Sequence, residues 1–294
     1  VITPAEVSKL TDWLLQIEIP VIINKLVNAY DQIVVRGPVY PHEVAGFSGG
    51  EKYLFPGIAG EEIINITHWL GALATSMDTI GNIDTPVRRI IQRASMFLKT
   101  PIANIAFCLK DNEVYGVYIG EMRETWMEAA NLSSKLNIVY VPERYQSVLS
   151  MPLEIYNELW TAAKAMYKLE PIVADGGELI IYAPQLREIS LTHSNYIKKV
   201  GYHVRDYFTK QWDTYCSYPW AVLAHATHLK GKGIYENGIE IPRINVKLAT
   251  GISEDLCQQL NLGYIDPHSI QVHDWENNGK LFVRNAGEIL YKIC

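Results

Sequence analysis

Short apolar runs bounded by turn residues alternate along the chain with longer segments that open on helix-capping residues. Thr3-Pro4 and Thr85-Pro86 each place a cap before a proline, which predicts helices from there to about Gln16 and Leu98. The same patterns predict further helices at Glu121–Lys135, Leu153–Leu169 and Asn195–Gln211. They predict strands at Gln32–Val35, Ile102–Leu109, Val114–Ile119, Asn137–Val141, Glu178–Tyr182 and Ala221–Ala224.

The order of these elements predicts an α/β fold in two domains, with mostly parallel sheets flanked by helices. Pro142 ends the strand that begins at Asn137, and we place the domain boundary next to that strand. The two domains are therefore expected at residues 1–138 and 139–294, with the active-site cleft between them. Gly176-Gly177 is interpreted as a turn between a helix and the following strand.

Composition narrows the classes of function. The 294 residues are 48% hydrophobic and 20% charged, which is typical of a globular protein with a substantial core. The formal net charge of -6 argues against nucleic acid as the main partner, and no apolar stretch reaches the roughly 18 residues that a membrane span needs. The four cysteines are far apart, which predicts free thiols in a reducing compartment and a cytoplasmic protein.

The main candidate for chemistry is a glycine-rich segment that follows the predicted strand Gln32–Val35. It reads Pro41-His42-Glu43-Val44-Ala45-Gly46-Phe47-Ser48-Gly49-Gly50-Glu51-Lys52, and Pro56-Gly57 and His68 follow. Histidine serves as an acid, a base or a metal ligand, and a desolvated lysine serves as a nucleophile. Glycine lets the backbone approach a ligand closely, so we expect a binding site here rather than a segment kept for packing.

This segment resembles the nickel-dependent lactate racemase family, whose members racemise or epimerise 2-hydroxy acids. The family motif is similar to PHxxAGxSGGxK, followed by PG and by a further histidine. Here Lys52 lies ten residues after His42 and His68 lies twenty-six residues after it, as in the family. Asn82–Val87 resembles a second family segment, and Lys164-Ala165-Met166 with Gly176-Gly177 resembles a third.

The resemblance implies a cofactor, the nickel pincer nucleotide (pyridinium-3,5-bisthiocarboxylate mononucleotide nickel), covalently attached to Lys52. It implies His68 as a nickel ligand and His42 as one of two histidines that move the substrate's hydroxyl proton. Histidine suits the proton transfer, because imidazole titrates near neutral pH. The hydride transfer would be carried out by the cofactor. The resemblance further implies cofactor contacts from Gly46, Ser48, Gly49 and Gly50, and substrate contacts from Trp160, Thr161 and Lys164.

Three departures from the family pattern change these expectations. The family's first catalytic histidine and an Asp/Arg-containing loop precede anything in this chain, so residues 1–138 are expected to be the C-terminal part of the cofactor-binding domain. A fragment of this kind is expected to be inactive, with residues 139–294 as the domain that closes over the cleft. Trp160-Thr161 replaces a Tyr-Gln pair, which predicts a substrate other than lactate. Glu51 replaces a basic residue and is expected to lower the positive charge near a phosphate.

Two other functions stay open on the residues alone. One is a non-catalytic relative that binds a nucleotide or a sugar acid, and the other is a metal-dependent hydrolase that uses His42 and His68. His68 could also cap the C-terminus of a helix that begins near Glu61, and His225 and His228, placed just after a strand, favour a structural role. The expected partners are a 2-hydroxy acid and the enzymes that make the cofactor, with association into a homo-oligomer left open and neither nucleic acid nor membrane included.

Overall fold

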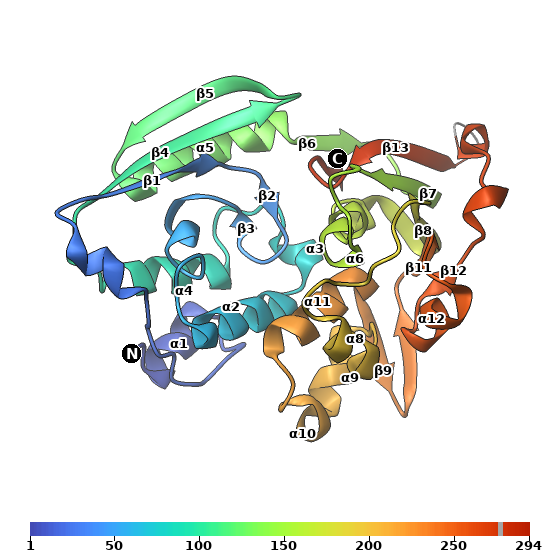
Figure 1. Cartoon of the computed structure of the whole chain (residues 1–294), viewed down its shortest axis with the longest axis horizontal. Coiled ribbons are helices and arrows are strands. Elements are labelled where there is room, and N and C mark those ends of the chain that lie inside the picture. Colours follow the sequence, from blue (N-terminus) through green and yellow to red (C-terminus); the bar gives the residue numbers. More distant parts are fainter. Residues whose placement is uncertain (276–278) are drawn as a thin grey trace. The chain divides into compact units, whose positions relative to one another are not determined.

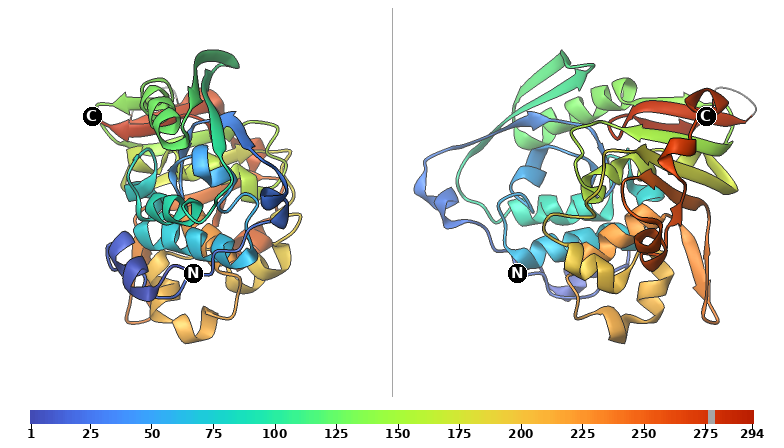
Figure 2. Two further views of the ribbon diagram at one scale, coloured as in Figure 1. Left: turned by 90° about the vertical axis from the view of Figure 1, so that its left-hand side faces the viewer. Right: turned by 45° about the vertical axis from the view of Figure 1, so that its right-hand side comes forward.

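The structure is a computed structural model that describes residues 1–275 and 279–294, and it divides into two compact units (Figures 1 and 2). Unit 1 is Val1–Ile138 and unit 2 is Val139–Cys294. The division falls at the residue where the sequence places a boundary. The roles assigned to the two parts, and the cleft between them, stay predictions.

Unit 1 is built on a three-stranded sheet with the order β1-β4-β5. β1 (Ile33–Pro38) runs parallel to β4 (Ile102–Lys110), and β4 pairs in antiparallel fashion with β5 (Glu113–Gly120). The helix α5 (Met122–Leu136) packs on β4 and β5 and covers one face of this sheet (Figure 1). The remaining elements are α1 (Pro4–Leu10), η1 (Lys25–Ala29), β2 (Pro41–His42), β3 (Gly46–Phe47), η2 (Gly50–Tyr53), α2 (Glu61–Ala74), α3 (Ser76–Thr79) and α4 (Pro86–Ser95).

The helices predicted from their caps in unit 1 are present, although the first is shorter than expected. Thr3 and Thr85 each accept a hydrogen bond from a backbone N–H of the first turn, at 3.4 and 3.1 Å, as N-caps do. The first helix ends at Leu10 because Asp12 and Trp13 adopt left-handed backbone angles (φ 52° and 65°). The Glu6 carboxylate binds Arg93 at 2.5 Å, which ties α1 to α4.

Unit 2 contains a five-stranded, fully parallel sheet with the order β12-β11-β8-β7-β13. Its strands are β7 (Tyr145–Pro152), β8 (Val173–Ala183), β11 (Asn245–Thr250), β12 (Gly263–Tyr264) and β13 (Lys280–Ala286). Helix α7 (Lys164–Tyr167) packs on β7 and β8, while Ile270 and the segment around it pack with Leu149, Ile180 and Ala249 of the sheet. Both faces of the sheet are therefore covered, as parallel sheets require.

The other elements of unit 2 surround this sheet. They are β6 (Ile138–Val141), which pairs with β14 (Leu290–Ile293), α6 (Leu159–Ala162), η3 (Glu170–Ile172), α8 (Ser194–Val200), α9 (Arg205–Lys210), α10 (Trp212–Tyr215), α11 (Trp220–Lys230), α12 (Glu254–Gln259), η4 (Pro267–Ser269) and η5 (Val272–Trp275). The hairpin of β9 (Gly233–Glu236) and β10 (Ile239–Pro242) extends away from the sheet (Figure 2).

The α/β class with parallel sheets and flanking helices is thus confirmed, but several elements of unit 2 are predicted wrongly. The helix expected at 153–169 begins only at Leu159, because the N–H groups of Leu159 and Trp160 bond to carbonyls of Glu188 and Ile189. The helix expected at 195–211 is interrupted at Gly201, which has φ 68°. Residues 221–224 lie in helix α11, whose buried apolar run resembles a strand in sequence.

Two further differences concern β7 and the glycine pair. The sequence misses β7, the strand between β8 and β13, because Ser147 and Ser150 interrupt its apolar pattern. Both hydroxyls are hydrogen bonded, to the Glu178 carboxylate at 2.8 Å and to the Ala165 carbonyl at 2.6 Å. Gly176 and Gly177 lie within β8 rather than in a turn before it.

Two expectations drawn from the composition concern the cysteines and membrane-spanning helices. Cys108, Cys216, Cys257 and Cys294 are all unbridged, as predicted. Throughout residues 1–275 and 279–294, no helix combines the length and the apolarity that crossing a membrane requires.

Candidate functional site

The glycine-rich segment of unit 1 forms a hairpin followed by a helical turn. β2 and β3 pair in antiparallel fashion, and Gly46, Gly49 and Gly50 have φ values of 80°, 78° and 61°. A Cβ at Gly46 would lie 1.9 Å from the Asn82 carbonyl oxygen, and one at Gly50 would lie 2.8 Å from the Trp126 ring. The expectation that this segment is not kept for packing is therefore wrong for these glycines, because protein atoms occupy the space beside them.

Ser48 is bound into the same hairpin. Its hydroxyl accepts from the Tyr40 N–H at 2.9 Å and donates to the Pro38 carbonyl at 3.2 Å, while its carbonyl accepts from the Trp126 indole at 2.8 Å. The hydroxyl therefore links the hairpin to the end of β1. Its proposed contact with a cofactor stays a prediction.

Arg88 on α4 supports the glycine turn through hydrogen bonds to its carbonyl groups. Its guanidinium donates to the carbonyls of Phe47 and, at 3.3 Å, Gly49, and it lies 3.5 Å from the Glu51 carboxylate and 4.0 Å from the centre of the Trp126 ring. Burial lowers the pKa of Arg88 to about 10, and the Glu51 charge opposes that shift. Glu51 is thus a buried partner of Arg88, so its charge is balanced within the fold rather than presented to a phosphate.

His42, at the end of β2, is oriented by the turn that follows it. Its Nδ1 accepts from the backbone N–H groups of Val44 at 3.1 Å and Ala45 at 3.4 Å. These two bonds favour the neutral tautomer whose proton sits on Nε2. The Glu43 carboxylate lies 3.4 Å from the same Nδ1, so it becomes a hydrogen-bond partner only when Nδ1 is protonated. The turn thus favours the tautomer with its proton on Nε2, whereas Glu43 favours a ring that carries a proton on Nδ1.

His68 lies in the middle of α2, not at a helix end, so the capping interpretation is wrong. Its Nδ1 lies 2.6 Å from the Ile64 carbonyl and donates to it, which leaves the lone pair on Nε2. The pKa of His68 is lowered mainly by burial; the bond to Ile64 raises it, Lys52 lowers it and Glu43 raises it. The charges of Lys52 and Glu43 therefore act on the ring, which brings three residues of the motif into one electrostatic environment.

The lowered pKa of His68 predicts that acid destabilises the chain. The unfolded state takes up a proton near pH 6.5 while the folded state resists it, so the free energy of unfolding should decrease as the pH falls below about 6.5. The slope from one such group is at most about 1.4 kcal/mol per pH unit. Urea titrations between pH 7.5 and 5 of the natural chain and His68→Gln measure this difference. Equal slopes for the two proteins would contradict the assignment.

The predicted substrate residues lie together in unit 2. Trp160 and Thr161 are on α6, and Lys164 begins α7. The Trp160 ring stacks on His225 with centroids 3.8 Å apart and meets His193 at 4.6 Å. The Thr161 hydroxyl donates to the Glu158 carbonyl at 3.1 Å, and the Lys164 ammonium lies 5.1 Å from the centre of the Tyr156 ring. Their contact with a substrate stays a prediction.

The other histidines of unit 2 take part in packing. His225 and His228 lie on the buried helix α11, where they contact Trp160 and, edge to face, Tyr167. They do not follow a strand, so that placement is wrong, while the structural role predicted for them agrees with their burial. His203 stacks on Tyr207 and lies 2.8 Å from the Glu240 carboxylate.

The ligand groups of the described residues limit the kind of metal site. In the parts of the chain that the structure describes, no three His, Cys, Asp or Glu side chains are placed so that they could hold a metal ion. A hydrolytic metal usually has three protein ligands, so His42 and His68 alone do not make such a site. A metal at the His68 Nε2 would need further ligands from outside the described residues, for example from a bound group. This donor set fits a cofactor that supplies most of the coordination.

Comparisons with known proteins agree with the motif. The sequence matches the family "Lactate racemase N-terminal domain" over residues 14–81, which include His42, Lys52 and His68. It is 27% identical over 170 residues to a lactate racemase from Thermoanaerobacterium thermosaccharolyticum, covering 55% of this chain and 38% of the relative. A lactate racemase from Lactiplantibacillus plantarum is 25% identical over 170 residues, with coverage of 55% and 39%.

Two solved structures resemble the fold. A crystal structure of a protein from Thermotoga maritima superposes with a TM-score of 0.91 at 33% identity, covering 99% of this chain and 74% of that one. The lactate racemase apoprotein from Thermoanaerobacterium thermosaccharolyticum superposes with a TM-score of 0.71 at 18% identity, covering 92% and 65%. The matched domain and the two relatives therefore support membership of the lactate racemase family.

Proposed function

We propose that the protein racemises or epimerises a 2-hydroxy acid by hydride transfer, using a nickel pincer nucleotide attached to Lys52. The observation that carries this proposal is the state of His68. Its Nδ1–H is held by the Ile64 carbonyl, its Nε2 keeps the lone pair, and Lys52 acts on it electrostatically. A neutral, oriented imidazole is what a nickel ligand must be, and imidazole suits nickel.

The proposed roles of the residues follow from their contacts. When bound, the cofactor would supply the group that accepts and returns the hydride from C2 of the substrate. Lys52 would hold the cofactor covalently. Its position on η2 follows directly after the glycine turn that Arg88 supports. His68 would bind the nickel through Nε2. Gly46, Ser48, Gly49 and Gly50 would shape the turn beside the nucleotide.

His42 is proposed to move the hydroxyl proton of the substrate. Nε2 would take that proton in the tautomer whose own proton lies on Nδ1, and the Glu43 carboxylate at 3.4 Å from Nδ1 would orient that tautomer and stabilise the resulting imidazolium. Racemisation also needs a second acid–base residue on the opposite face of the substrate. The chain spans less than two fifths of the length of the curated relatives it matches, so we propose that the second acid–base residue lies outside these 294 residues.

The test is an assay of the complete protein after co-expression with enzymes that make and insert the cofactor. Conversion of one enantiomer or epimer of a 2-hydroxy acid, together with nickel in the protein, would support the proposal. Binding of a nucleotide or sugar acid without conversion would instead indicate a non-catalytic relative. The 294-residue chain alone, matured in the same way, should show no conversion.

The substrate is expected to be larger or more polar than lactate, such as a sugar acid. Trp160 has a larger ring system than the tyrosine it replaces, and the Thr161 hydroxyl is already bound to its own turn. Lactate should therefore lack an orienting contact worth roughly 1–3 kcal/mol, which is about tenfold to a hundredfold in kcat/KM. A panel of 2-hydroxy acids measures this preference. The highest kcat/KM for lactate would contradict the role given to Trp160 and Thr161.

A further inference from the structure

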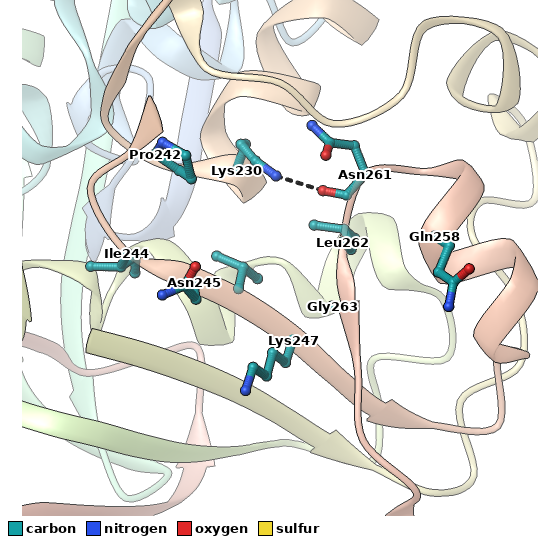
Figure 3. Close-up of a pocket in the computed structure, with 10 residues that line it drawn as sticks. Lys230, Pro242, Ile244, Asn245, Lys247, Gln258, Asn261, Leu262 and Gly263 are labelled. Carbon is teal, nitrogen blue, oxygen red and sulfur yellow. Dashed lines mark hydrogen bonds between the residues drawn. The ribbon is translucent and has the colours of Figure 1, made fainter. Parts of the chain in front are cut away.

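Unit 2 contains a cavity of about 380 Å³ that none of the proposed catalytic or substrate residues lines (Figure 3). It lies where β11 and β12 begin, beside the last residue of α11. Its volume is within the range of small-molecule sites. It is lined by Lys230, Pro242, Ile244, Asn245, Val246, Lys247, Gln258, Asn261, Leu262 and Gly263.

Lys230 is the more deeply buried of the two lysines that line this cavity, and it has unused hydrogen-bonding capacity. It is only 9% exposed, and its ammonium donates to the Asn261 carbonyl at 2.6 Å. An ammonium carries three N–H donors, and the structure gives this one a single acceptor among the described residues. Burying a charge is costly unless hydrogen bonds compensate for it, so an acceptor from a ligand would stabilise Lys230.

The nearby carboxylate of Glu240 does not supply the missing hydrogen-bond acceptor for Lys230. The Glu240 carboxylate accepts from the Val204 N–H at 2.6 Å and the Asn261 amide at 2.7 Å, and His203 lies 2.8 Å from it. Its charge favours protonated Lys230, while burial lowers the pKa of that amine. Lys247 also lines the cavity, but its ammonium is bound to Glu178 at 2.7 Å and points away from Lys230 (Figure 3).

The rest of the lining indicates a ligand with hydroxyl groups. Asn245 donates its amide N–H to the carbonyls of Gly176 and Gly177, at 3.1 and 3.3 Å, which leaves its side-chain oxygen as an acceptor. Gln258 likewise donates to Glu254 at 3.3 Å and keeps its oxygen. Ile244 and Leu262 add apolar surface for a carbon skeleton.

We propose that this cavity binds a small hydroxylated organic anion, whose carboxylate or phosphate group pairs with Lys230. The anionic group accepts from the ammonium, the hydroxyls donate to the Asn245 and Gln258 oxygens, and the carbon chain lies on Ile244 and Leu262. This site is separate from the residues assigned to the 2-hydroxy acid and does not depend on the function proposed for them.

Calorimetry on the chain without cofactor tests the proposal with glycerol 3-phosphate, 3-hydroxybutyrate and glycerol. At least one of the two anions should bind saturably, and which one binds more tightly identifies the anionic group; uncharged glycerol should not bind. Lys230→Met should weaken anion binding by about tenfold or more, whereas Lys198→Met, at an exposed lysine of α8 that does not line the cavity, should leave it unchanged. Absence of saturable binding, or unchanged affinity in a folded Lys230→Met variant, would overturn the proposal.

A second pair of variants keeps the test valid if Lys230→Met fails to fold. Gln258 and Gln259 are exposed neighbours at the end of α12, and only Gln258 lines the cavity. Gln258→Glu should weaken anion binding by about fivefold through repulsion at the rim, and Gln259→Glu by less than about twofold. Equal effects of the two substitutions would show that the anion binds elsewhere.

Discussion

Lys52→Ala is expected to abolish the covalent cofactor and, with it, the racemase activity of the matured protein. The hydride acceptor in the proposed reaction belongs to the cofactor, so no side chain can replace it. Intact mass of the matured natural protein should exceed the sequence mass by a nucleotide-sized adduct, and Lys52→Ala should show the sequence mass alone. Its kcat should fall by more than about 10³-fold.

A matched control separates attachment from a general loss of positive charge. Lys25 is an exposed lysine of η1 in the same unit, and Lys25→Ala should keep both the adduct and the activity. An adduct that persists in Lys52→Ala would exclude Lys52 as the attachment point. Loss of the adduct in both variants would instead point to impaired recognition by the maturation enzymes.

Arg88→Met is expected to destabilise the chain by about 3–5 kcal/mol, because it leaves Glu51 as a buried charge without its partner. The carbonyls of Phe47 and Gly49 lose their donor in the same step, so the glycine turn loses its support. Urea unfolding at neutral pH measures the change. The double variant Arg88→Met with Glu51→Gln should recover part of the loss, because it removes the unpaired charge.

The neighbouring Arg89 provides the comparison. Arg89 pairs with Asp12 at 2.9 Å and Asp84 at 2.7 Å, but the two aspartates are 64% and 68% exposed. Arg89→Met should therefore cost only about 0–1 kcal/mol. If Arg88→Met cost no more than Arg89→Met, the buried network beneath the turn would not have the structural role assigned to it.

The sequence predicts unit 1 better than unit 2, for reasons that individual residues make clear. In unit 1, the N-caps Thr3 and Thr85 determine local structure directly, so the helices that they begin can be predicted from the sequence. In unit 2, Gly201 interrupts a helix, and the N–H groups of Leu159 and Trp160 are taken by a segment almost thirty residues away. Such contacts between distant segments cannot be read from periodicity.

The candidate site shows the same contrast between features that are local in the sequence and contacts between distant segments. His42, Lys52 and His68 stand out because histidine and lysine carry chemistry at fixed spacings in one segment. Arg88 and Trp126 were missed because they act from α4 and α5, through contacts over 37 to 78 positions of sequence. One signal was present: Arg88 follows Val87 and precedes Ile91 by one helical turn, so it lies on the apolar face of its helix.

The most direct test of the proposed reaction follows the hydrogen at C2 of the substrate. The complete, matured protein is given a 2-hydroxy acid labelled with deuterium at C2, in ordinary water, and the product is examined by mass spectrometry. Hydride transfer predicts that the inverted product keeps its deuterium, because the hydrogen never equilibrates with solvent. Loss of the label to water at the rate of inversion would show proton abstraction at C2 and would contradict the proposed function.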